Sequence, residues 1–269
     1  MHFIVSFSRG DKMIEFLQKY LLPLLHEMER PRAWGAFHAL FFFIGIPLAI
    51  LLAFALRKIS KKTEKRLFLT VGIALIISEI FKQLAFTAIE GMYRFDLIPF
   101  QLCSIPMYLC ILIPMLPDGK IQRAMRTFIA TFGLMGGVAS YIAPGTMCRE
   151  WLELTLHSFL WHLTLIFLGF YVFFSHNTKI QKHDFLGAEM LYLTLCVVAF
   201  VINLLCFNAS GEPVNMFYIG PKPSDLPICR EIIARFGVAV NSIGYISALS
   251  LCAYLIHLTE SFIKKIFKQ

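Results

Sequence analysis

The amino-acid sequence predicts an all-α, polytopic membrane protein, and its composition and hydrophobic patterning carry that prediction. Of the 269 residues, 58% are hydrophobic and only 16% are charged, whereas an average soluble chain carries roughly 25% charged residues. Several apolar runs reach the length of about 20 residues that a helix needs to cross a bilayer. A transmembrane β-barrel would instead show short segments of alternating polarity.

The first 33 residues predict a helix that lies in the membrane interface. Between residues 12 and 28 the apolar side chains recur at helical spacing, and charged side chains occupy the other face. Such a stripe is typical of an interfacial amphipathic helix, with a kink expected at Pro23. Residues 1–10 lack the apolar core of a cleavable signal peptide.

Seven apolar runs follow and predict a seven-transmembrane-helix bundle over residues 34–258, with a short basic tail at 259–269. The predicted spans are 34–56, 67–89, 97–116, 126–143, 151–174, 185–206 and 236–258.

The basic residues predict the orientation of this bundle in the cell membrane. The net charge is +8, and most Lys and Arg fall in the loops 57–66, 120–126 and 179–182 and in the tail. Positive charge marks the cytoplasmic side, so we expect a cytoplasmic C-terminus and an external N-terminus. The same pattern favours membrane topology over a nucleic-acid partner.

The seven cysteines do not form a metal-binding pattern. No CxxC pair or His/Cys ligand spacing occurs, so we predict no metal site and no cofactor. Cys148 and Cys229 fall in loops predicted to lie outside, where a single disulfide between them is one alternative.

Polar side chains inside the second span indicate a buried site or an internal ion pair. Glu79, Lys82 and Gln83 stand at i, i+3 and i+4, and so share one helix face. An ionisable side chain at membrane depth costs at least about 2.5–3.5 kcal/mol. The acid and the base either neutralise each other between helices or form the wall of a cavity.

Four further candidates lie at comparable depth: His38, Cys103, His157 and His162. At a rise of about 1.5 Å per residue, all seven side chains lie roughly 6–17 Å from the outer ends of their spans. We therefore expect one cavity in the outer half of the bundle. His157 and His162 point about 140° apart on a helix, so they cannot both face Cys103 equally.

A thiol beside an imidazole favours acyl transfer through a thioester. The thiolate is the nucleophile, and an imidazole can accept its proton and later return it. Lys82 or Gln83 would then hold the oxyanion or a lipid phosphate. The alternative is a non-enzymatic carrier or receptor, in which the same polar cavity binds a small polar solute or a lipid head group.

Five short motifs carry a resemblance to a known family: WGAFHALFF, ISEIFKQ, LIPFQLCSIP, LHSFLWHLTLIF and PVNMFYIGPKP. In this order the chain resembles the YwaF-like integral membrane family, which is related to the transmembrane protein 164 acyltransferases. The resemblance covers nearly the whole chain. It departs at Leu102 and Ser104, where the animal members have Pro and His.

The resemblance implies a phospholipid acyltransferase or transacylase with membrane phospholipids or acyl-lipids as substrates. It implies Cys103 as the essential cysteine, His162 as the essential histidine and Asn215 as a further site residue. The motif thus ranks His162 above His157, whereas the expected depth ranks His157 above His162.

Overall fold

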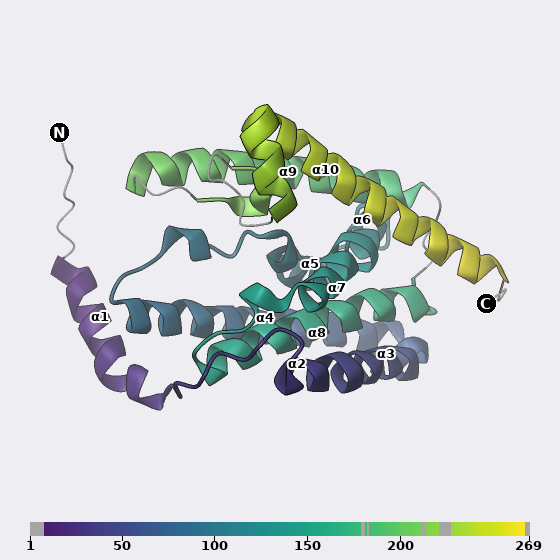
Figure 1. The fold of residues 1–269 in the computed structure, drawn as a ribbon. Coiled ribbons are helices and arrows are strands. Elements are labelled where there is room, and N and C mark those ends of the chain that lie inside the picture. The colour runs from purple at the N-terminus through teal and green to yellow at the C-terminus, as the bar shows by residue number, and fades with distance from the viewer. Residues whose placement is uncertain (1–7, 179–180, 182, 211–213, 221–226, 267–269) are drawn as a thin grey trace.

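The computed structural model describes residues 8–178, 181, 183–210, 214–220 and 227–266. These residues form helices and no strand, with one isolated bridge between Glu27 and Trp151. Most helices run along a common direction, and α1 (Ser8–Tyr20) and the C-terminal end of α10 (Pro227–Ile266) lie at opposite ends of the bundle (Figure 1). The chain is therefore an all-helical, multi-pass membrane protein.

Five helices in the described part of the chain are long and apolar enough to cross a membrane. They are the run Ala36–Lys58 (α2, η2, α3 and η3), α4 (Lys61–Glu90), α8 (Leu152–Phe174), α9 (Asp184–Ser210) and α10 (Pro227–Ile266). Two further helical regions, which are not among these five, lie between α4 and α8. These are η5 with α5 (Leu102–Ser104 and Ile105–Met115), and α6, η6 and α7 (Lys120–Phe128, Ile129–Gly133 and Leu134–Ile142).

Two of the predicted spans differ from the observed helices, each at a residue that breaks helical geometry. The third predicted span begins at residue 97, but its helix begins only at Leu102, because Pro99 has no backbone donor and Ile98 before it has an extended ψ of 130°. In α10 the backbone leaves helical geometry at Gly237, which has φ 84° and ψ 169°. Glycine takes this conformation at little cost, so the predicted start at residue 236 corresponds to the second half of α10.

The N-terminal helix is shorter than the predicted stretch 12–28. α1 spans Ser8–Tyr20 and is followed by the 3-10 turn η1 (Leu22–Leu24), which contains Pro23. A proline cannot continue the hydrogen-bond ladder, so the chain turns there. In Figure 1, α1 runs across the end of the bundle at which α4 ends and α8 begins. Leu17 is buried, whereas Met13, Phe16 and Tyr20 stay exposed.

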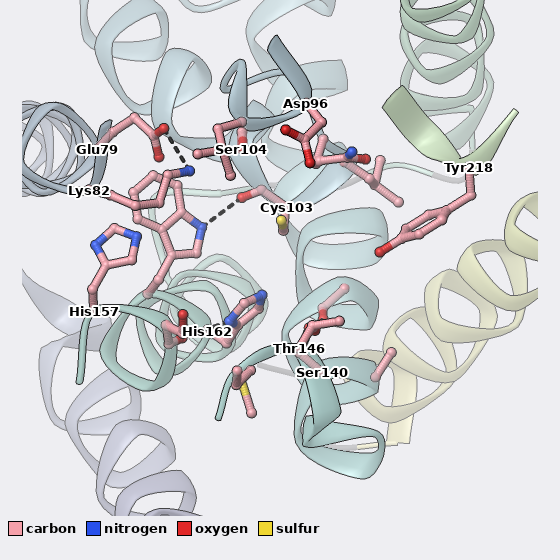
Figure 2. A pocket seen from close by; sticks show the side chains of 18 of the residues that line it. Glu79, Lys82, Asp96, Cys103, Ser104, Ser140, Thr146, His157, His162 and Tyr218 are labelled. Atoms are coloured by element: carbon pink, nitrogen blue, oxygen red, sulfur yellow. Dashed lines mark hydrogen bonds and ion pairs between the residues drawn. The ribbon is translucent and has the colours of Figure 1, made fainter. Parts of the chain in front are cut away.

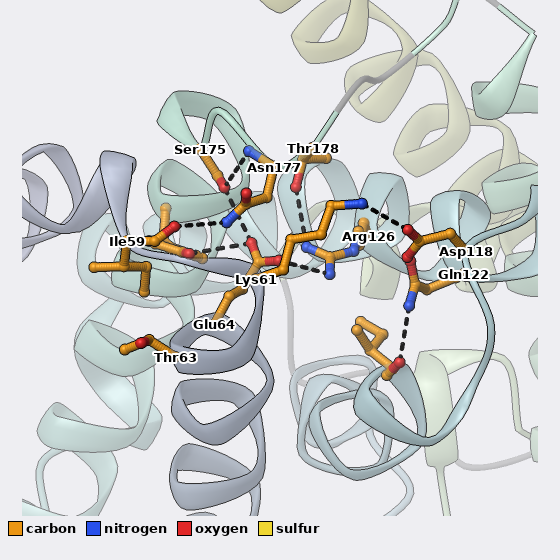
Figure 3. A network of polar contacts seen from close by, with 12 residues as sticks. Ile59, Lys61, Thr63, Glu64, Asp118, Gln122, Arg126, Ser175, Asn177 and Thr178 are labelled. Atoms are coloured by element: carbon orange, nitrogen blue, oxygen red, sulfur yellow. Dashed lines mark hydrogen bonds and ion pairs between the residues drawn. The ribbon is translucent and has the colours of Figure 1, made fainter.

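A buried ion pair joins three helices at the opposite end of the bundle (Figure 3). Arg126 donates from Nη2 to Glu64 Oε2 at 3.0 Å, and these residues are only 5% and 2% exposed. The other oxygen of Glu64 accepts from Tyr171 and Ser175, while Arg126 Nη1 donates to Thr178 at 3.0 Å. Each charged group is thus paired with the other and makes further hydrogen bonds, as a buried pair requires. The network ties the start of α4 to α6 and to the end of α8.

No disulfide bond joins any two of the seven cysteines. All are free thiols, including Cys148 and Cys229. The protein therefore relies on packing and hydrogen bonding rather than on cross-links.

Replacing Glu64 with Ala should lower the free energy of unfolding by about 3–5 kcal/mol, because it leaves the Arg126 charge buried and unpaired. The matched control is Lys61→Ala, which breaks the exposed Lys61–Asp118 pair (65% and 66% exposed) and should cost about 1 kcal/mol or less. Unfolding in detergent micelles measures both. Equal losses would contradict the role given to the buried pair.

Candidate functional site

An irregular stretch of backbone, residues 98–101, and the 3-10 turn η5 that follows it carry Cys103 into the bundle between α4 and α5. Non-helical backbone inside an apolar protein needs internal partners for its polar groups. Gln83 of α4 donates to the carbonyl of Leu97, and Trp161 of α8 donates from Nε1 to the carbonyl of Cys103 at 3.0 Å. Side chains of two helices therefore fix the position of the cysteine.

Gln101 attaches the same segment to the loop before α10. It donates to the carbonyl of Asn215 at 3.1 Å and accepts from the Phe217 N–H at 2.9 Å. Phe217 and Tyr218 have φ of 57° and 56°, and non-glycine residues in this region cost about 1–3 kcal/mol each. Asn203 of α9 stabilises the turn, because it both accepts from and donates to the backbone of Met216. This bonding aims Tyr218 at the cavity (Figure 2).

The cavity beside Cys103 has a volume of about 490 Å³. Of the eight predicted site residues, the structure brings five to its lining: Glu79, Lys82, Cys103, His157 and His162. In Figure 2 the sulfur of Cys103 and the imidazole of His162 both face this space from different elements. Ser104, Ser140 and Tyr218 add hydroxyl groups to the wall.

The hydrogen bond of His162 defines which of its nitrogens can accept a proton. Nδ1 lies 2.7 Å from the backbone carbonyl of Ser158. A carbonyl only accepts hydrogen bonds, so Nδ1 must carry the hydrogen and Nε2 of the neutral ring keeps its lone pair. His162 is thereby prepared to act as a base through Nε2.

His157 occupies a different part of the cavity wall. Its Nδ1 lies 2.7 Å from the hydroxyl of Ser78, and its ring packs against Trp161 with centroids 5.3 Å apart. In Figure 2 it lies on the side of Glu79 and Lys82, away from the labelled Ser140 and Thr146. Because the hydroxyl can donate or accept, this contact leaves the tautomer of His157 open.

The polar face of α4 forms a buried pair in this wall. Lys82 Nζ lies 2.7 Å from Glu79 Oε1, and Glu79 is only 5% exposed. Gln83 donates to the same oxygen at 2.6 Å and also bonds to Leu97. The i, i+3, i+4 spacing thus gives one connected group, in which Gln83 positions its neighbours and the other two reach the cavity.

Three of the eight predicted residues lie outside the lining: Gln83, already described, and His38 and Asn215. His38 is fully buried, with Nε2 3.0 Å from the carbonyl of Tyr141 and its ring among Trp34 and Phe159. The imidazole packs in this aromatic pocket and bonds through Nε2, while its Nδ1 is buried without a hydrogen-bond partner among the described residues. Asn215 accepts from the N–H of Gly220 at 2.7 Å and so shapes the loop next to the cavity.

Sequence reasoning missed Gln101, Trp161 and Tyr218, which position or complete the site. Gln101 had a signal, because it is a polar residue inside an apolar segment two positions before Cys103. Trp161 stands next to His162 but reads as an ordinary core aromatic. Among the residues that the structure describes, no group of three His, Cys, Asp or Glu side chains could hold a metal ion.

Trp161→Phe should loosen the cysteine segment, because the carbonyl of Cys103 loses its donor. We expect the free energy of unfolding to fall by about 1–3 kcal/mol and Cys103 to react faster with N-ethylmaleimide. Trp34→Phe is the matched control, since Trp34 is exposed at 53%. Unchanged labelling of Cys103 in Trp161→Phe would contradict the anchoring role.

Comparison with known proteins agrees with this helical, membrane-embedded architecture. The family model of the TMEM164 family matches residues 31–255, which is most of the chain. No curated protein and no solved structure matches. The link to YwaF-like bacterial proteins stays a prediction, whereas the chain itself belongs to the TMEM164 family.

Proposed function

We propose that this protein is a membrane-embedded phospholipid acyltransferase or transacylase that forms an acyl-thioester on Cys103. One observation carries the proposal: Cys103 and His162 line the same cavity, and Nε2 of His162 is the ring nitrogen left to accept a proton. A nucleophile and a base that meet in one cavity are the elements of covalent acyl transfer. The resemblance described above points to the same two residues.

In the first step, the thiol gives its proton to His162 Nε2 and the sulfur attacks the ester carbonyl of a donor lipid. The carbon–sulfur bond forms, and the carbon–oxygen bond of the ester breaks. The departing alkoxide takes the proton back from His162 and leaves as a lyso-lipid. Two donors of the cavity lining, Lys82 and the hydroxyl of Ser104, would stabilise the oxyanion that forms in this step.

In the second step, the hydroxyl of an acceptor lyso-lipid gives its proton to His162 and attacks the thioester. The carbon–sulfur bond breaks, the new ester forms, and the thiolate recovers the proton. Donor and acceptor are both bilayer-soluble, so the reaction needs no soluble co-substrate. His157 and Glu79 complete the polar wall, whereas Gln83 and Asn215 position the backbone around it.

One feature favours a different function, that of a carrier or receptor. The Glu79–Lys82 pair faces the cavity and would suit a small polar solute or a lipid head group. In that case ligand binding would depend on Glu79 or Lys82, and Cys103 would be dispensable. The same variants therefore separate the two functions.

We further propose that the chain crosses the membrane seven times. The 23 residues of Lys120–Ile142 form one continuous helical run, which is long enough to span, and the segment 97–116 enters as an irregular stretch followed by a helix. α1 would lie in the interface, with exposed Met13, Phe16 and Tyr20 toward the lipid. The basic stretch 57–66 and the C-terminal end of α10 share one end of the bundle (Figure 1), which would be cytoplasmic.

Acyl transfer between phospholipids in proteoliposomes tests the proposed chemistry. Cys103→Ser should reduce transfer to background, and Cys110→Ser, on the following helix α5, should not. His162→Ala should lower the rate by about 10²–10⁴-fold as loss of a general base, and His157→Ala by less. Parent-rate transfer by Cys103→Ser would exclude the thioester, and the opposite ranking of the histidines would exchange their roles.

Fusing a reporter that fluoresces only in the cytoplasm tests the orientation. A fusion after Gln269 should fluoresce, and a fusion before Met1 should not, because the basic loops stay inside. Fluorescence from both termini would require an even number of crossings and would contradict seven.

A further inference from the structure

The lining of the cavity contains one more positively charged residue than negatively charged residues. Glu79 pairs with Lys82 at 2.7 Å, and Asp96 accepts from Arg94, with 2.9 Å between Oδ1 and Nε. The fifth charged residue of the lining is Arg149. None of the ion pairs among the described residues includes it. An uncompensated cation in an apolar frame is costly, so this cavity favours an anionic occupant.

Arg149 is held in place without a carboxylate. Its backbone N–H and carbonyl both bond to the hydroxyl of Thr155, a fully buried residue in the first turn of α8. Its guanidinium lies over the ring of Phe86, 5.5 Å from the centroid. The nearby carboxylates of Asp96 and Glu90 are both engaged by Arg94.

The electrostatic surroundings of Arg149 reinforce this imbalance. Burial and the neighbouring charges of Arg30 and Arg94 lower the pKa of the Arg149 guanidinium, and the carboxylates of Asp96 and Glu90 offset this only in part. Arginine still stays protonated at any physiological pH. The positive charge is therefore permanent and incompletely balanced.

Arg149 also stands where two cavities meet. A second cavity of about 250 Å³ shares Phe86, Arg149 and Leu154 with the first. Arg30 lines this second cavity and is fixed by a bond from Nη2 to the carbonyl of Gly145 at 2.6 Å. Its carboxylates are Glu90, which is bound to Arg94, and Glu150, which is exposed.

We propose that Arg149, with Arg30 behind it, binds a phosphate group that carries a single negative charge, as a phosphodiester does. A guanidinium presents a planar fork of donors that matches phosphate oxygens. A phosphodiester would also neutralise the one surplus charge of the lining. As a substrate-binding site this rests on the proposed function: the head group would lie at Arg149 while the acyl ester reaches Cys103 within the same cavity.

Binding to the full chain in detergent micelles tests the site without catalysis, when every variant is made in a Cys103→Ala background. The probes are palmitoyl lysophosphatidylglycerol and palmitoylglycerol, which differ by the phosphoglycerol group. Arg149→Gln should weaken binding of the first by roughly tenfold or more, as expected for lost charge-assisted hydrogen bonds, and leave the second unchanged. Arg149→Lys keeps the positive charge but loses the planar fork of donors. Its affinity for the lysophospholipid should lie between those of the parent and of Arg149→Gln.

Arg66→Gln removes the same charge from an exposed position in the first turns of α4, at the other end of the bundle, and should bind like the parent. Inorganic phosphate is the third probe: competition that requires Arg149 identifies a soluble phosphate, and absence of competition identifies a lipid head group. Equal loss for both lipid probes, or no loss in folded Arg149→Gln and Arg149→Lys, overturns the inference. Selective loss with no acyl transfer by the parent protein would instead overturn the proposed function alone.

Discussion

The site depends on one constraint: residues 98–101 are not helical and only the short 3-10 turn η5 carries Cys103, yet this segment lies inside an apolar bundle. The polar backbone groups there need partners from the protein; two side chains bond to carbonyls of the segment, and a third anchors the segment to a neighbouring loop. Gln83 holds Leu97, Trp161 holds the carbonyl of Cys103, and Gln101 joins the segment to the loop at 214–220. The partners belong to α4, to α8 and to the segment itself. The position of the sulfur is thus a property of the whole assembly rather than of α5.

The two ends of the bundle differ in the surroundings of their charged side chains. At the end where α4 begins, Glu64 and Arg126 are buried, paired with each other and hydrogen-bonded to neighbouring side chains, so this pair stabilises the fold. At the other end, Glu79 and Lys82 face a cavity, and Arg149 lies between two cavities without a carboxylate partner in the described chain. Buried charge stabilises the fold at the first end and is available to a ligand at the second.

Sequence predicted the helical runs well because apolar length and flanking basic residues are strong signals. Each of the seven predicted spans overlaps a helical run, and the Glu79–Lys82 contact follows from i, i+3 spacing. Site residues that were predicted only from their depth along a span were less reliably placed. His38 lies at a suitable height but faces Tyr141 and Phe159 instead of the cavity, because depth along a helix does not specify the direction in which a side chain points. Gln101 and Trp161 act through tertiary hydrogen bonds, which no periodicity reveals.

The most direct test of the central claim is the intact mass of the protein purified from membranes, followed by mapping of any adduct to a peptide. The account predicts a fatty acyl mass on the peptide that contains Cys103, released by neutral hydroxylamine as a thioester should be. An unmodified Cys103 in protein that transfers acyl chains, or an acyl group found only on another cysteine such as the exposed Cys252, would contradict it.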